Sequence, residues 1–258
     1  MRSRRSPDRA AGHTLVELAL VLLVIAILAL ATALPLAAQV EMRRVDETRR
    51  LLDEARDAIL AFAAMHGRLP CPASAASHGD ESFDAGGSGS DGRCAHFLDG
   101  FLPAAALGLS PLDPEGFARD AWQTPGNRIR YAVSGDPVNG VAQALTRTNG
   151  MQAAGLAALG AQSHYLFVCA SAAGATGSGC GPSTNQLTRR AAFVLLSTGA
   201  NGANVPSAGS DEARNLSGDG TFVAHEASTD ATHPFDDLVT WVPVHLVAHR
   251  LLTAGRLP

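Results

Sequence analysis

One carboxylate near the start of the chain stands where an apolar segment begins. Glu17 directly precedes residues 18–38, a run without a single charged side chain. Placing an ionised carboxylate in hydrocarbon costs about 2.5–3.5 kcal/mol even on lenient insertion scales. Two opposite charges in a medium of low dielectric constant stabilise each other. The position of Glu17 therefore predicts a cationic partner for its side chain.

Four cysteines offer a second kind of chemistry. They all follow the apolar run, at Cys71, Cys94, Cys169 and Cys180. If the run crosses a membrane, the cysteines enter a compartment in which disulfides persist. Four cysteines allow three pairings. We favour the local pairs 71–94 and 169–180, because each closes a turn-rich loop, and free buried thiols remain the alternative.

The sequence contains no complete catalytic pattern of the common kinds. His245 and His249 have the i,i+4 spacing found in zinc hydrolases, but Leu246 stands where that motif requires Glu. The glycine-rich segment 177–181 lacks the Lys-Ser/Thr pair of a phosphate-binding loop, and no Gly-x-Ser-x-Gly sequence occurs. A formal net charge of -4 gives no general attraction to nucleic acid. We therefore expect a protein that is not an enzyme and does not bind nucleic acid.

The apolar run is long enough to position Glu17 at a membrane. About 20 residues of helix cross a hydrocarbon core, and residues 18–38 meet that length. Within the first twelve residues, Arg2, Arg4, Arg5 and Arg9 stand against Asp8 alone, and such a basic end before an apolar run is held in the cytoplasm. Hydropathy alone also permits a cleaved secretory signal or a plain signal anchor, since small residues lie at 31–33 and 36–38.

The residues around Glu17 distinguish these alternatives. The string GHTLVEL, from Gly12 to Leu18, resembles the cleavage and methylation signal of type IV prepilins and type II secretion pseudopilins. The resemblance implies that a prepilin peptidase cuts after Gly12 and methylates the new N-terminal residue, His13. It also implies that Glu17 meets the N-terminal amine of a neighbouring subunit during fibre assembly. The chain departs from the family at His13, where Phe or Met is usual.

Beyond the apolar run the sequence predicts that the helix continues with one apolar face. Val45, Leu52, Ile59 and Phe62, with Thr48 and Ala55 between them, recur at steps of three and four. Charged residues occupy the other faces. We expect the helix to end at His66-Gly67, because Gly suits a C-terminal cap and Pro70 cannot continue a helix.

The sequence after residue 66 predicts an α+β domain. Residues 73–92 have the composition of a loop, and the segments that follow are short. Predicted strands cover residues 128–134, 163–170, 191–197, 220–225 and 237–242, and a helix follows Pro243 through Leu252. Successive strands joined by turns predict an antiparallel sheet, laid on the long helix.

Several phrases in this part also resemble the pseudopilin family. They are LPCPAS at 69–74, DAWQTPGNRIRYAV at 120–133, STGANG at 197–202 and FDDLVTW at 235–241. The resemblance implies a pilin-like organisation: a leader at 1–12, a long helix at 13–66 and a periplasmic domain at 67–258. Within the helix, residues 18–38 would cross the membrane and residues 39–66 would be amphipathic.

The function that the resemblance implies is that of a structural subunit. The chain would be a single-pass inner-membrane protein that enters a pilus or a pseudopilus fibre. Its partners would be the prepilin peptidase, other pilin or pseudopilin subunits, the inner-membrane assembly platform and membrane lipid. The alternative is a signal-anchored periplasmic binding protein that never enters a fibre.

We expect no cofactor, and calcium binding is the one exception that the sequence allows. Some pseudopilins hold calcium in a C-terminal loop, and this chain has oxygen-bearing side chains in the corresponding region. They are Asn201, Asn204, Asp211, Asp219, Asp236 and Asp237. Asp and Asn are also common turn residues, and we assign no ligand set from the sequence.

Overall fold

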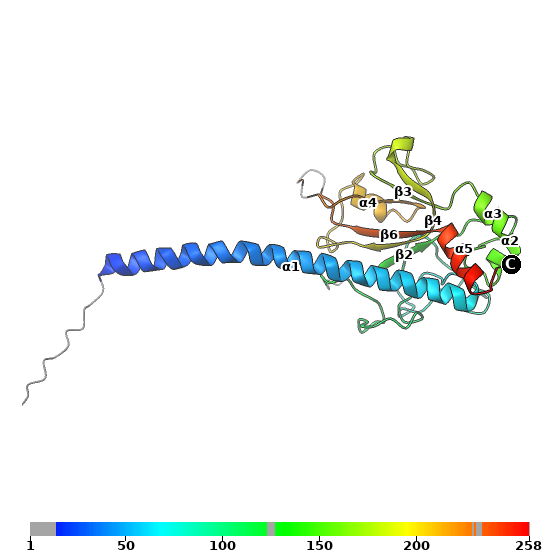
Figure 1. The fold of residues 1–258 in the computed structure, drawn as a ribbon, viewed down its shortest axis with the longest axis horizontal. Coiled ribbons are helices and arrows are strands. Elements are labelled where there is room, and N and C mark those ends of the chain that lie inside the picture. The colour runs from blue at the N-terminus through cyan, green and yellow to red at the C-terminus, as the bar shows by residue number, and fades with distance from the viewer. Residues whose placement is uncertain (1–13, 123–126, 229, 231–233, 258) are drawn as a thin grey trace, which may run out of the picture. The chain divides into compact units, whose positions relative to one another are not determined.

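The computed structural model describes residues 14–122, 127–228, 230 and 234–257, without the side chains of residues 28–37. The chain divides into two units, Met1–Arg43 and Arg44–Pro258. The first helix belongs to both units, and the second unit contains the sheet and every other helix described (Figure 1). The fold of this second unit is α+β, as the sequence predicts.

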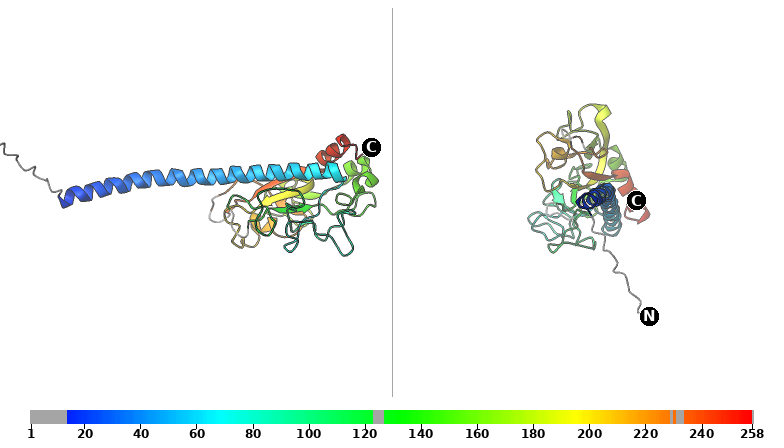
Figure 2. Two further views of the ribbon diagram at one scale, coloured as in Figure 1. Left: turned by 90° about the horizontal axis from the view of Figure 1, so that it is seen from below. Right: turned by 90° about the vertical axis from the view of Figure 1, so that its left-hand side faces the viewer.

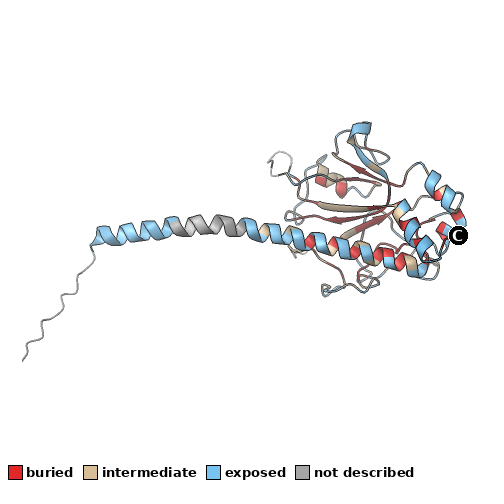
Figure 3. Cartoon of the chain, in the orientation of Figure 1, coloured by how far each residue is buried: buried red, intermediate tan, exposed pale blue. Residues whose placement is uncertain are grey.

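Helix α1 spans Leu15–His66 and buries one face of its second half. Thr48, Leu52, Ala55, Ile59 and Phe62 are buried, at the spacing that the sequence pattern predicts. Figure 3 shows these positions as a red stripe between exposed turns of the same helix. Val45, the first member of the predicted stripe, is only half-buried.

The end of α1 follows from two residues. His66 is the last helical residue, and Gly67 adopts a left-handed backbone conformation with φ 68°. The Gly67 N–H donates to the carbonyl of Ala63 at 2.8 Å, which satisfies a carbonyl of the last turn. Glycine takes this conformation without the steric penalty of a side chain, so the helix ends where the sequence indicates.

A six-stranded sheet forms the centre of the second unit. Its strands are β1 (Gly100–Phe101), β2 (Arg130–Val133), β3 (Leu166–Cys169), β4 (Gln186–Ser197), β5 (Thr221–Val223) and β6 (Leu238–Pro243). The order is β1-β2-β4-β3-β5, and β6 also pairs with β4. Strand β4 is the longest and pairs with three others, and its residues from Ala191 to Ser197 are all buried.

The expectation of a purely antiparallel sheet needs correction, since the sheet is mixed. Strands β3 and β5 run parallel, with Phe167 opposite Thr221 and Cys169 opposite Val223. Parallel neighbours need a long crossover connection. Here that connection contains β4 and the short helix α4 (Asp211–Asn215). All other pairings are antiparallel.

The remaining helices are short, apart from the last. They are α2 (Gly150–Ala154), α3 (Leu156–Ala161), a 3-10 turn at Ser183–Asn185 and α5 (Val244–Thr253). Helix α5 begins directly after Pro243, as the sequence predicts. The chain beyond α5 returns to α1, where the Arg256 guanidinium donates to the carbonyls of Ala64 and Met65.

The sheet has an apolar layer on each face. Tyr131, Val133, Phe193 and Leu195 belong to the larger cluster, which also contains the buried face of α1. Alternate residues along the same strands, such as Ala132 and Val194, join a smaller cluster on the opposite face. Figures 1 and 2 show the part of α1 from Arg44 onward lying along the sheet, with α5 beside its end.

Candidate functional site

The start of α1 places Glu17 in a defined local structure. The Thr14 hydroxyl accepts the Glu17 backbone N–H at 3.3 Å, and the Glu17 carboxylate accepts the Thr14 N–H at 3.4 Å. This reciprocal pair is a capping box, which satisfies two of the N–H groups left open at a helix start. Glu17 is therefore held in the first turn, where the helix dipole favours negative charge. Gly12 and His13, the predicted cleavage and methylation sites, lie outside the described residues.

The helix after Glu17 presents apolar side chains to its surroundings. Leu18, Leu22 and Ile27 are each more than half exposed, and so are most of the apolar residues between them. Within the described part of the chain, no helix combines the length and apolar character that a membrane crossing requires. The predicted span 18–38 includes residues 28–37, whose side chains lie outside the description.

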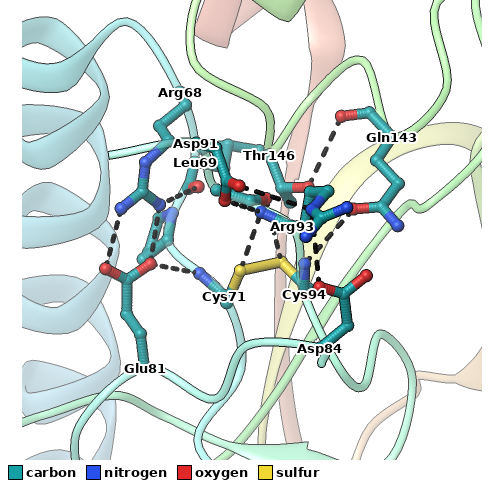
Figure 4. The surroundings of a disulfide bond; sticks show 12 residues. Arg68, Leu69, Cys71, Glu81, Asp84, Asp91, Arg93, Cys94, Gln143 and Thr146 are labelled. Carbon is teal, nitrogen blue, oxygen red and sulfur yellow. Dashed lines mark hydrogen bonds and ion pairs between the residues drawn. A yellow bond between two sulfur atoms is a disulfide. The ribbon is translucent and has the colours of Figure 1, made fainter. Parts of the chain in front are cut away.

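A buried ion pair fixes the chain just beyond the end of α1. Arg68 is 2% exposed, and its guanidinium donates to both oxygens of the Glu81 carboxylate at 2.6 and 2.8 Å. It also donates to the carbonyl of Gly89 at 2.9 Å and lies over the Phe62 ring of α1. Two parallel bonds between a guanidinium and a carboxylate combine strength with fixed geometry. Figure 4 shows this pair beside a disulfide.

Both disulfides have the local pairing that the sequence favoured. Cys71 is bonded to Cys94 across 23 residues, and Cys169 to Cys180 across 11. The first bond closes the loop that contains Glu81, and the Cys71 N–H donates to the Glu81 carboxylate at 2.7 Å. The disulfide and the ion pair therefore hold the same loop against the end of α1 (Figure 4).

Three carboxylates meet where α4 lies beside the start of β6. The side-chain oxygens of Glu212, Asp236 and Asp237 lie within 4.8 Å of one another. Burial raises the pKa of Asp237 to about 8, the Asn215 amide opposes this effect, and the neighbouring Glu212 and Asp236 carboxylates add to it. Among the described residues this is the one group of three or more His, Cys, Asp or Glu side chains close enough to share a cation.

Two amide groups donate hydrogen bonds to the carboxylates of this cluster. Asn201 Nδ2 donates to Glu212 at 2.8 Å, and Asn215 Nδ2 donates to Asp237 at 2.7 Å. We assign no metal ligands to this cluster.

The other oxygen-bearing residues singled out in the sequence lie apart from this cluster. Asp211 instead accepts from the Ala172 N–H and contacts His225 Nε2 at 2.9 Å. Asp219 pairs with Arg214 at 3.1 Å. Asn204 lies in an exposed turn, where its N–H donates to the Asn201 carbonyl.

The two histidines at i,i+4 lie on an exposed face of α5. His245 and His249 border a pocket of about 140 Å³ between α3 and α5, which is otherwise lined mainly by apolar groups such as Leu159 and Ala248. No third metal-binding side chain joins them among the residues described.

Comparison of the chain with protein-family models, with curated proteins and with solved structures finds no match.

Sequence reasoning missed three features of these sites. The capping box could have been found from the Thr14-x-x-Glu17 spacing. The ion pair could not, because nothing in the local sequence indicates that Arg68 is buried. Glu212 was also missed, since it follows a common turn segment and its burial depends on residues that are distant in the sequence.

Proposed function

We propose that this protein is a prepilin-like structural subunit, processed after Gly12 and assembled through its N-terminal helix into a pilus or pseudopilus fibre. The observation that carries the proposal is the sequence Gly12 to Glu17 at the head of α1. There a peptidase recognition glycine, a carboxylate and an uncharged run coincide. The exposed apolar side chains of residues 15–27 support it, because such a surface needs lipid or other helices to cover it.

The second unit supports the same role in a different way. A pilin-like domain needs one face of a long helix to be fixed on a sheet, and α1 has such a face from Thr48 to Ala63. In the proposal this domain lies in the periplasm and forms the outer surface of the fibre. Its partners are the prepilin peptidase, other subunits, the assembly platform and membrane lipid. No catalytic role and no cofactor are proposed.

The cleavage step is tested by the mass of the membrane-extracted protein when it is produced with a prepilin peptidase. We expect a mature N-terminus at His13. Replacing Gly12→Val should leave the chain uncut, because the bulkier residue blocks the scissile bond, whereas Ala10→Val is a matched control that should be processed normally. An N-terminus near Ala38, or an intact Met1 in the unaltered chain, would instead support a secreted or signal-anchored binding protein.

The assembly step is tested by Glu17→Gln. Gln can replace Glu in a capping box, so the helix start should persist while the negative charge is lost. We expect normal cleavage but little or no incorporation into fibres, measured by the amount of subunit in sheared or crosslinked filaments. Glu47→Gln, an exposed position on the same helix, is the control and should assemble as the unaltered chain does. Normal assembly of the Glu17 variant would contradict the proposed role of the charge.

A further inference from the structure

Strand β5 stands at one end of the strand order, and its two sides have different partners. On the side of β3, the Gly220 carbonyl accepts a hydrogen bond at 2.8 Å and the Ala224 N–H donates one at 2.9 Å. The backbone groups of successive residues in a strand point to opposite sides. The N–H and C=O groups of Thr221 and Val223 therefore face away from β3, where the structure describes no further strand.

Side chains occupy three of these four outward groups. The Asn215 amide oxygen accepts the Val223 N–H at 2.7 Å, and the amide nitrogen donates to the Val223 carbonyl at 3.0 Å. The Asp219 carboxylate accepts the Thr221 N–H at 3.0 Å. Because a side-chain amide carries the same donor and acceptor as a peptide group, Asn215 bonds to Val223 as a residue of a neighbouring strand would.

Helix α4, which supplies Asn215, is held on the domain by polar contacts. Its two buried residues are Glu212 and Asn215. The Glu212 carboxylate accepts from the Asn201 side chain at 2.8 Å and from the Asp236 N–H at 3.2 Å. The Asn215 amide nitrogen also donates to the Asp237 carboxylate at 2.7 Å. Hydrogen bonds of this kind can be exchanged for hydrogen bonds to water, unlike the apolar packing that fixes α1.

The length and the connections of α4 fit an element that can leave the sheet edge. Its five residues form little more than one turn, and such a short helix is not stable by itself. Residues 198–210, which join it to β4, contain no helix or strand. Its first residue, Asp211, is also held by polar contacts, with the Ala172 N–H and with His225. Release of α4 therefore requires the loss of hydrogen bonds and not the opening of an apolar core.

The other end of the strand order is covered by main chain. Phe101 of β1 and Ala73 exchange two hydrogen bonds of 2.8 Å. At β5 the cover consists of side chains, from α4 and from Asp219. An open strand edge pairs with strands of other chains, so α4 lies where another strand would otherwise bind.

We propose that α4 is an autoinhibitory strap: it occupies the β5 edge as a strand would, and its release lets β5 pair with β5 of a second copy of this chain. Two copies related by a twofold axis beside Val223 exchange its N–H and C=O, as in a hydrogen-bonded pair of an antiparallel ladder. Because both copies present the same edge, their donors and acceptors match without any other sequence. This inference does not depend on the proposed fibre role.

The first test measures backbone amide exchange by NMR in the full-length protein, in detergent and at low concentration. The Val223 N–H is bonded to α4, whereas the Ala224 N–H is bonded within the sheet. We expect the Val223 N–H to exchange about tenfold faster or more, because the strap opens without the sheet. Equal rates show that α4 and the sheet open together, and this result overturns the proposal.

The second test removes the two buried anchors of the strap in the double variant Glu212→Ala/Asn215→Ala. Sedimentation equilibrium in the same detergent should show self-association about tenfold tighter or more than in the unaltered chain, the effect of about two added hydrogen bonds. The Val223 N–H should exchange fast in dilute solution and slowly again as the protein concentration rises. Asp80→Ala/Asn204→Ala removes one carboxylate and one amide at exposed positions, and should leave both measurements unchanged.

Two outcomes of the second test overturn the proposal. One is association no tighter than in the unaltered chain. The other is tighter association that leaves the Val223 N–H in fast exchange at every concentration, since the copies then meet through another surface. If the Ala224 N–H of the double variant loses its protection, that variant does not fold, and the comparison of Val223 with Ala224 in the unaltered chain decides the matter.

Discussion

At the scale of single residues, the buried Arg68–Glu81 pair fixes the chain at the end of α1. Both side chains are almost fully withdrawn from water, and each satisfies the charge of the other. Removing one member of such a pair leaves an uncompensated charge in the interior. The exposed pair Arg56–Asp53 on α1 has a similar distance of 2.8 Å but lies in solvent, where ion pairs contribute little.

We therefore expect Glu81→Ala to lower the free energy of unfolding by about 3–5 kcal/mol, the usual effect of breaking a buried pair. Asp53→Ala should change it by less than about 1 kcal/mol. Urea unfolding of the full chain in detergent, followed by circular dichroism, measures both. Similar small effects for the two variants would mean that Arg68 finds another acceptor when Glu81 is absent.

Asp237 predicts a dependence of stability on pH. Its folded-state pKa is about 8, against the ordinary carboxyl value of 3.8 in the unfolded chain. Below pH 4 the carboxyl is protonated in both states and has no effect. Between pH 4 and 8 the unfolded chain loses the proton that the folded chain keeps, so stability falls as pH rises, and the loss is complete above pH 8. One pKa unit corresponds to about 1.4 kcal/mol.

Asp237→Asn should remove this dependence, because Asn stays neutral and can still accept the Asn215 hydrogen bond. The variant should gain stability over the unaltered chain at pH 8 and little at pH 4, as measured by thermal unfolding at both values. Asp80→Asn, at an exposed position, serves as the control. A gain that is the same at both pH values would show that Asp237 does not hold the proton.

At the scale of elements, the two disulfides differ in the length of chain that they close. A crosslink stabilises the folded state mainly by restricting the unfolded chain, and this effect grows slowly with loop length. Cys71–Cys94 closes 23 residues and Cys169–Cys180 closes 11. We expect the double replacement of Cys71 and Cys94 by Ser to lower the free energy of unfolding by about 3 kcal/mol.

Replacing Cys169 and Cys180 in the same way should cost about half a kcal/mol less, since the loop is half as long. Thermal unfolding under non-reducing conditions compares the two variants. The reverse order would show that the packing around Cys169 and Cys180, rather than loop length, sets the contribution of each bond.

Elements with strong local patterns could be predicted from the sequence. The end of α1 at His66, residues 191–197 of strand β4 and helix α5 each follow from an apolar segment or from Gly and Pro positions, whereas the first five residues of β4 were not predicted. Strand β1 could not, because two residues carry no pattern and Gly100–Phe101 is extended only through its pairing with β2. The parallel pairing of β3 with β5 was also missed, since local sequence does not encode which edge a returning strand joins.

At the scale of the whole molecule, the sequence and the structure contribute to different parts of the functional argument. Composition and the string around Gly12 and Glu17 lead to the proposed fibre subunit, and the structure adds the capping box that holds Glu17. The structure alone shows the groups that depend on the folded chain, such as the Arg68–Glu81 pair and the carboxylates of Glu212 and Asp237. These contacts join residues far apart in the sequence, which local patterns do not record.

The arrangement just after α1 has a mechanical consequence. Tension along α1 reaches the domain partly through the side chains of its buried face, and these non-covalent contacts can shift or separate. It also passes through Gly67 and Arg68 to Cys71 within five residues, and from there a covalent bond carries the load to Cys94 on the far side of the loop. The Leu69 N–H, bonded to the Leu145 carbonyl at 2.8 Å, shares this load. Pulling on the helix therefore loads the loop closed by Cys71 and Cys94 before it can unfold the strands of the sheet.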